Sequence, residues 1–377
     1  MKFINKNRES VWAPAISVLA LMLFLFVPGV HAQDAKPAPQ ATPLPVQLDP
    51  PPPPLPKPSP TPKLPQDEEY EVIRISSNLV VVPVSVTDVV GQPVPGLKAD
   101  SFRLQEEGRE QQIAQIGDAE QVPLEIALLI DISGSINASF EFEKDAAARF
   151  LKQVLKPGDR ATIFVIDRTP VLRQISATSD VAASGLLSLQ PASDKGPTAF
   201  FDTVVEAANY LGEKTPARHR RVVLAISDGV DNFSERIKKA IGETAKEQEA
   251  IAPETRRKIY DRALREVQRE VQRADAAFYS INPSGNTMHL NVMTRRGQEG
   301  MQQLADATGG SAFVPEAAGN LDGVFQRIAA ELRAQYLLQY YSGDESAKGK
   351  FLHIKVTIPS HPELRIRARE GYYVTRK

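Results

Sequence analysis

The segment Leu124–Ser135, LEIALLIDISGS, decides how the rest of the chain is interpreted. Its apolar run from Ile126 to Ile130 predicts a strand buried on both faces, as in a parallel sheet covered by helices. The run ends abruptly in Asp131, Ser133 and Ser135. In an open α/β sheet, ligands bind outside the carboxyl ends of the strands, so a carboxylate and two hydroxyls here indicate a binding site. Because all these donors are oxygens, they favour a hard cation such as Mg²⁺.

Two further segments place oxygen donors where such a fold could return a loop to the same edge. Gly196-Pro197-Thr198 precedes a helical pattern, which puts the Thr198 hydroxyl in a loop at a helix start. Arg221–Gly229, RVVLAISDG, predicts a second buried strand that ends in Asp228. The combination favours a site over a serine-rich turn.

Asp131-x-Ser133-x-Ser135, together with Thr198 and Asp228, resembles the metal-ion-dependent adhesion site of the von Willebrand factor type A domain. The resemblance implies a doubly wound, mostly parallel, Rossmann-like α/β fold. It also implies that these five residues bind Mg²⁺ or Mn²⁺, and that the domain binds proteins rather than catalysing a reaction. Hydroxyl ligands bring no formal charge, so an ion held by them and two carboxylates stays electron-poor. Such an ion can accept a further carboxylate from a protein partner.

Sequences on both sides of this region resemble secreted bacterial proteins of the VWFA-related family. The segments concerned are VTDVVGQPVPGLKADSFRLQEEG (86–108), before the site strand, and YLLQYY (336–341) with REGYYV (369–374), near the carboxyl end. The match covers roughly residues 70–375. It supports the fold assignment and hardly helps with function, because the function of that family is poorly defined.

The composition excludes several functional classes. The formal net charge of the 377 residues is −1, which gives no support to nucleic-acid binding. Cysteine is absent, so there are no disulfides, thiolate metal sites or cysteine nucleophiles. The 5 histidines are scattered along the sequence, which gives little support to a histidine metal cluster or to Ser-His-Asp catalysis.

The amino-terminal residues predict export. Basic residues precede an apolar run from Ala15 to Val30, and Val30-His31-Ala32 is typical of a signal-peptidase site. Residues 1–32 are therefore expected to be a cleaved signal peptide of a secreted, periplasmic or cell-envelope protein. The alternative is an uncleaved membrane anchor with the rest of the chain facing outward. Residues 33–69 are proline-rich and predict a disordered linker, in the form of a stiff polyproline II spacer or, alternatively, a PxxP docking ligand.

Residues 70–120 and 335–377 are expected to be two halves of one β domain. The first half is rich in β-formers, and its stretch 102–106 suggests a hairpin with 113–116. In the second half, 352–358 and 364–368 alternate apolar and polar residues, which predicts a hairpin of two half-buried strands. Because each half is too small to bury its apolar face alone, we expect a shared β-sandwich-like domain.

Residues 121–334 predict the α/β domain itself. Further strands are expected at 160–167, 276–281 and, at the sheet edge, 311–314, and helices at 141–155, 181–189, 262–274, 300–308 and 321–334. The charged stretch 232–261, interrupted by Pro253, is an insertion. It is interpreted as a solvated helical pair or, alternatively, as a partner-binding surface beside the site.

The sequence thus favours an exported, metal-dependent protein-binding module, for adhesion or envelope interaction, over an enzyme. Phosphatases of the haloacid dehalogenase type resemble this strand tip but require a second Asp where the chain has Ser133, and no phosphate-binding Gly-rich loop with Lys occurs. A Mg²⁺-dependent phosphoryl-transfer enzyme remains one alternative. The other is a structural envelope protein whose site is vestigial.

Overall fold

The computed structural model describes residues 78–133, 140–192, 196, 198–242, 245–285, 292–315, 320–343 and 348–374. The expected signal peptide and the proline-rich linker lie outside these residues. Within the described residues, no helix is both long and apolar enough to cross a bilayer.

The chain alternates between strands and helices over most of its described length. In chain order, the strands are β1 (Leu79–Thr87), β2 (Arg103–Glu106), β3 (Arg109–Gln111), β4 (Ile113–Asp118), β5 (Leu124–Asp131), β6 (Arg160–Ile166), β7 (Val171–Ala177), β8 (Arg220–Ile226), β9 (Ala276–Ile281), β10 (Ala312–Phe313), β11 (Tyr336–Tyr341), β12 (Phe351–Thr357), β13 (Arg365–Ala368) and β14 (Gly371–Tyr373). The helices are α1 (Phe140–Val154), α2 (Ser179–Leu187), α3 (Phe200–Lys214), α4 (Glu235–Ile241), α5 (Ala245–Ala250), α6 (Pro253–Arg273), α7 (Val292–Thr308) and α8 (Leu321–Arg333).

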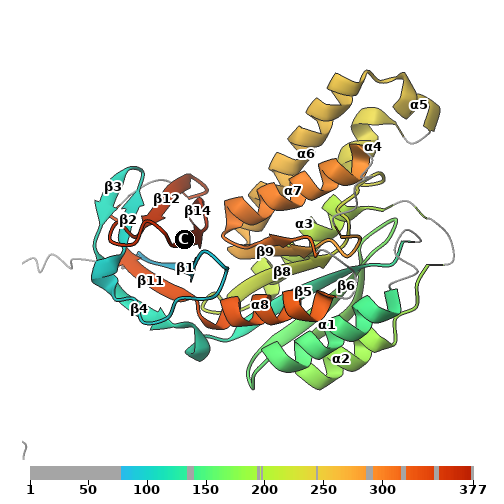
Figure 1. Cartoon of the computed structure of the whole chain (residues 1–377). Coiled ribbons are helices and arrows are strands. Elements are labelled where there is room, and N and C mark those ends of the chain that lie inside the picture. The colour runs from blue at the N-terminus through green and yellow to red at the C-terminus, as the bar shows by residue number, and fades with distance from the viewer. Residues whose placement is uncertain are drawn as a thin grey trace, which may run out of the picture. The chain divides into compact units, whose positions relative to one another are not determined.

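The central sheet has six strands in the order β10-β9-β8-β5-β6-β7. All neighbours pair in parallel except β7, which is antiparallel to β6. The sheet carries helices α1, α2 and α8 on one face and α3, α6 and α7 on the other (Figure 1). The predicted fold class, a doubly wound and mostly parallel α/β sheet, is confirmed.

Strand β5 is the centre of this arrangement, because every one of its residues is buried. Ile126, Leu128 and Ile130 pack into the cluster on the α1 side, whereas Ala127 and Leu129 pack into the cluster on the α3 side. The continuous apolar run therefore follows from helices covering both faces. As a result, the residue at the end of the strand is withdrawn from water as well.

Two antiparallel sheets are built from both flanks of the α/β region. Their strand orders are β13-β1-β11-β4 and β14-β12-β2-β3, so strands that precede the α/β region pair with strands that follow it. Their apolar inner faces share one core, with Val82, Leu104 and Tyr340 among its most buried members. Helix α8 leads almost directly into β11, the strand between β1 and β4.

Salt bridges and hydrogen bonds join these two sheets to the α/β region. Glu331 of α8 accepts a hydrogen bond from Tyr279 of β9 at 2.9 Å and forms a salt bridge with Arg367 of β13. Arg369 forms a salt bridge with Asp275 and donates to the carbonyl of Val81 at 2.8 Å. The sheets are thus fixed at the end of the central sheet where its parallel strands begin.

The structure corrects both predicted hairpins. Strand β12 pairs with β14 and β2, while β13 pairs with β1 in the other sheet, so the strands at 352–358 and 364–368 do not form a hairpin. Strand β2 turns at Glu107-Gly108 into β3, and 113–116 crosses to pair with β11 as β4. Alternation identifies a strand and its buried face, but it carries no information about which strand lies alongside.

Two other expectations need correction, and one strand was missed. Pro253 opens α6 rather than interrupting the region. The N–H groups of the first helical turn have no acceptor within the helix, so a proline there loses no helical hydrogen bond. Helix α7 begins at Val292, well before the predicted start at Gly300. Strand β7 was not predicted, because as an irregular edge strand it is only partly buried.

We expect Leu104→Ala to lower the free energy of unfolding by about 2–5 kcal/mol, because Leu104 is fully buried in the shared β core. Leu79→Ala is the matched control, since Leu79 is 46% exposed on the same pair of sheets and should change stability by less than about 0.5 kcal/mol. Urea denaturation measures both. Equal effects would contradict the burial of Leu104 in this core.

Candidate metal site at the carboxyl edge of the central sheet

Asp131 is the last residue of β5, and its side chain is buried at the sheet edge, with 1% of the residue exposed. One carboxylate oxygen, Oδ1, accepts the backbone N–H of Ser133 at 2.9 Å, and Oδ2 accepts the hydroxyl of Ser227 at 2.8 Å. Burial raises the pKa of Asp131 to about 6, the hydrogen bonds from Ser133 and Ser227 lower it in part, and the nearby charge of Asp228 raises it.

Asp228 follows β8, the strand beside β5, and its Oδ1 accepts the backbone N–H of Val230 at 3.0 Å. Burial raises the pKa of Asp228 as well. Within the described part of the chain, no Lys, Arg or His forms a salt bridge with Asp131 or Asp228. Two neighbouring, poorly solvated carboxylates without such a cation fit a divalent metal ion, which would offset the cost of their burial.

The turn after Asp228 is fixed by a close approach of two backbones. Gly229 has φ +73°, and a Cβ atom there would lie 2.8 Å from the carbonyl oxygen of Gly297 in α7. A Cβ on Gly297 would in turn lie 2.6 Å from the carbonyl carbon of Gly229. Glycine is therefore required at both positions, and the Asp228 loop is held against α7.

Thr198 is buried in the loop that leads into α3. Its backbone N–H donates to Oδ1 of Asn232 at 2.7 Å, and its carbonyl accepts the backbone N–H groups of Asn232 and Phe233, both at 3.2 Å. The next N–H along, that of Ala199, donates to the carbonyl of Asp167 at the end of β6. These bonds bring Thr198 to the edge where β5, β6 and β8 end.

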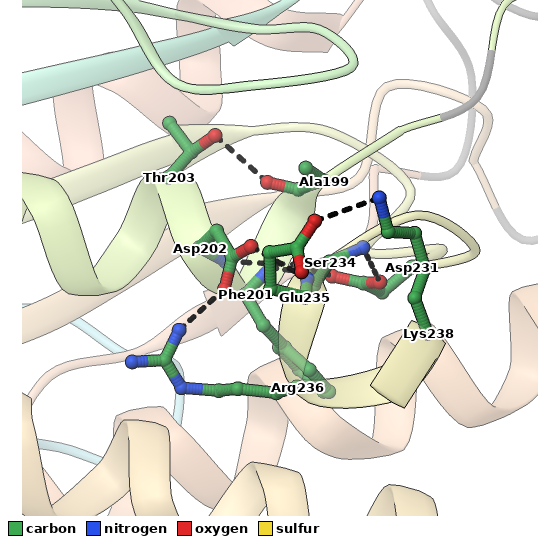
Figure 2. A network of polar contacts seen from close by, with 9 residues as sticks. All are labelled: Ala199, Phe201, Asp202, Thr203, Asp231, Ser234, Glu235, Arg236 and Lys238. Carbon is green, nitrogen blue, oxygen red and sulfur yellow. Dashed lines mark hydrogen bonds and ion pairs between the residues drawn. The ribbon is translucent and has the colours of Figure 1, made fainter. Parts of the chain in front are cut away.

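Asp231 is a third buried carboxylate near this edge. It accepts the backbone N–H of Phe201 at 2.6 Å, the backbone N–H of Ser234 at 3.0 Å and the hydroxyl of Ser234 at 2.5 Å (Figure 2). Burial raises its pKa to about 6, and the bonds from Ser234 and Phe201 lower it in part. These contacts are with backbone or hydroxyl groups that belong to the starts of α3 and α4.

Of the five residues predicted to hold the metal, the structure brings Asp131, Ser133 and Asp228 together, and it places Thr198 in the adjoining loop. Ser135 lies outside the described residues. No group of three or more His, Cys, Asp or Glu side chains that could hold a metal occurs among the described residues, so a metal here would depend on hydroxyl ligands.

The sequence interpretation assigned no role to Ser227 or Asp231, and it treated 232–234 only as the start of the charged insertion. Ser227 could have been noticed, because it directly precedes Asp228 at the tip of a buried strand. The contacts of Asp231 and Asn232 are with the α3 loop, which is distant in sequence, and no local pattern indicates them.

Residues 126–230 match the family model of the von Willebrand factor type A domain. No curated protein matches the sequence.

Similar folds occur among solved structures. An aerotolerance-related membrane protein from Bacteroides fragilis is 16% identical, with a TM-score of 0.37 over 55% of this chain and 98% of that one. The vWF domain of the type V pilus tip protein Mfa5 from Porphyromonas gingivalis is 14% identical, with a TM-score of 0.40 over 55% and 94% of the two chains. Proximal thread matrix protein 1 from the mussel byssus, with zinc in its MIDAS motif, is 14% identical, with a TM-score of 0.40 over 60% and 49%.

The pKa of Asp231 predicts how stability changes with pH in chelated protein. Since the pKa of this carboxyl rises from its ordinary value of 3.8 to about 6 on folding, protonated Asp231 favours the fold. This contribution is complete below about pH 4 and is lost as the pH rises through about 6, by up to about 3 kcal/mol. Asp231→Asn should therefore flatten the profile of unfolding free energy between these values.

Urea denaturation across this pH range measures the effect. Asp131 titrates in the same window but is unchanged by the substitution, so the difference between the two profiles isolates Asp231. Parallel profiles for wild type and Asp231→Asn would show that Asp231 does not contribute.

Proposed function

Residues 126–230 belong to a von Willebrand factor type A domain, and from this premise we propose that the protein is an exported, metal-dependent module that binds other proteins. The observation that supports the proposal most is the pair of neighbouring carboxylates, Asp131 and Asp228, which lose solvation at two strand tips and form no salt bridge within the described residues. Export is inferred from the amino-terminal residues, whose pattern is typical of a signal peptide, and an exported module could act in adhesion or at the cell envelope.

In this proposal, Mg²⁺ or Mn²⁺ binds Asp131, Ser133, Ser135, Thr198 and Asp228. Two carboxylates do not fill the coordination positions of an octahedral ion, and the neutral hydroxyls add no negative charge, so the ion can accept another anionic ligand. An acidic side chain of a partner protein would supply that ligand. The residues of this chain hold and orient the ion, and no catalytic step is assigned to them.

The metal is tested by calorimetric titration of chelated protein with MgCl₂ and MnCl₂. Wild type should bind one ion, and Asp131→Ala should abolish binding while the fold survives. Asp167→Ala is the matched control, because Asp167 follows the adjacent strand β6 but its Oδ1 accepts the N–H of Arg168, at 2.7 Å. The control should bind nearly as tightly as wild type.

Absence of binding at millimolar metal in a folded sample would contradict the proposal and favour a vestigial site in a structural envelope protein. Metal-dependent turnover of phosphorylated model substrates, lost in Asp131→Asn, would favour the enzyme instead.

The partner contact is tested by affinity capture on immobilised protein with and without chelator. We expect capture to depend on Mg²⁺ or Mn²⁺ and to be lost with Asp131→Ala or Thr198→Ala. A captured protein that binds equally well with chelator, and equally well to Asp131→Ala, would show that the interaction uses another surface.

A further inference from the structure

Helix α3 begins at a residue that cannot cap it. Its N-cap is Ala199, which has no side-chain oxygen to accept from the N–H groups of the first turn, and these groups have no acceptor within the helix. Two of these groups are satisfied from elsewhere in the chain: Phe201 N–H donates to Asp231 at 2.6 Å, and Asp202 N–H donates to the hydroxyl of Ser234 at 3.0 Å. The start of α3 therefore depends on the segment that follows Asp228.

The start of α4 depends on α3 in return. The N-cap residue of α4 is Ser234, and the first N–H of the helix, that of Glu235, donates to Asp202 at 2.7 Å. Arg236 also forms a salt bridge with Asp202. Figure 2 shows this reciprocal arrangement, in which Asp202 of α3 accepts from the start of α4, and Asp231 and Ser234, just before α4, accept from the start of α3. It resembles a capping box, but the two halves come from different helices.

Asn232 extends the same contact to the predicted metal ligand. It binds the backbone of Thr198 on both sides, through Oδ1 to the N–H at 2.7 Å and through its own N–H to the carbonyl at 3.2 Å. Thr198 immediately precedes Ala199, and Asp231 comes shortly after Asp228. The hydrogen bonds thus connect two loops that each carry one predicted ligand.

We infer that Asp231, Asn232 and Ser234 are positioning residues, which hold Thr198 at a fixed place relative to Asp228 so that the metal site is formed before the ion arrives. The inference rests on the proposed function, because it requires that these residues ligate a metal. Ligands held in place need no ordering on binding, and substitution of residues that orient ligands commonly lowers metal affinity about 10- to 100-fold.

Asn232→Ala removes the acceptor for the Thr198 N–H and should weaken Mg²⁺ binding, measured by calorimetry, by about tenfold or more. Asn232→Asp keeps an oxygen at that position, so it should bind at least as tightly as wild type. Ser234→Ala should weaken binding in the same direction, because it releases the Asp202 N–H and one bond to Asp231. If Asn232→Ala does not fold, Ser234→Ala is judged by the same criterion.

General destabilisation is controlled by Thr308→Val. Thr308 is buried, and its hydroxyl accepts the N–H of Phe278 at 2.9 Å and donates to Leu304, at some distance along the sheet from the predicted ligands. This variant should lose stability, measured by urea denaturation, but keep its Mg²⁺ affinity.

The outcomes separate the two claims. If folded wild type binds no Mg²⁺, the proposed function fails, and the positioning role fails with it. If wild type binds Mg²⁺ and folded Asn232→Ala binds it equally well, only the positioning role is overturned. The positioning role is also overturned if Thr308→Val weakens binding as much as Asn232→Ala does.

Discussion

A carboxylate at the end of a fully buried strand is the constraint on which the rest of the structure depends. Asp131 is covered because β5 lies between β6 and β8 and beneath helices on both faces. Its charged form is therefore disfavoured, and its two oxygens accept hydrogen bonds from Ser227, just after β8, and from Ser133, just after β5. A fold that needed only stability would place an apolar residue here, since burying an ionisable group is unfavourable.

The two ends of the central sheet carry different kinds of side chain. At the end where its parallel strands begin, Arg221 donates to the carbonyls of Thr215 and Ala274, both at 2.9 Å, which are the C-cap residues of α3 and α6. Positive charge at helix carboxyl ends is stabilising, so Arg221 stabilises the ends of both helices. The flanking antiparallel sheets attach there through Arg367 and Arg369. The opposite end carries Asp131 and Asp228, for which the described residues supply no salt-bridge partner.

Sequence alone predicted every strand of the central sheet except β7, and the residues at the strand tips, because both depend on local patterns. The apolar run Ile126 to Ile130 indicated a strand buried on two faces, and Asp131 and Asp228 stood at the ends of apolar runs. Partners distant in sequence were not predictable. The alternation at 364–368 does not indicate that this strand pairs with β1. The sequence around Asp231 likewise does not indicate that its side chain caps α3. Pro253 was misjudged because the same residue can end one helix or begin another.

The pairing of β1 with β11 has a consequence for the order in which the chain folds. Leu79 lies opposite Tyr341, with the whole α/β region between them in sequence. During synthesis, β1 emerges long before either of the strands that flank it. The intervening α/β region must bring the two ends together, since non-local pairing is slow until loop closure is complete. Contact order therefore predicts that the antiparallel sheets close only after the α/β region has brought their two flanks together.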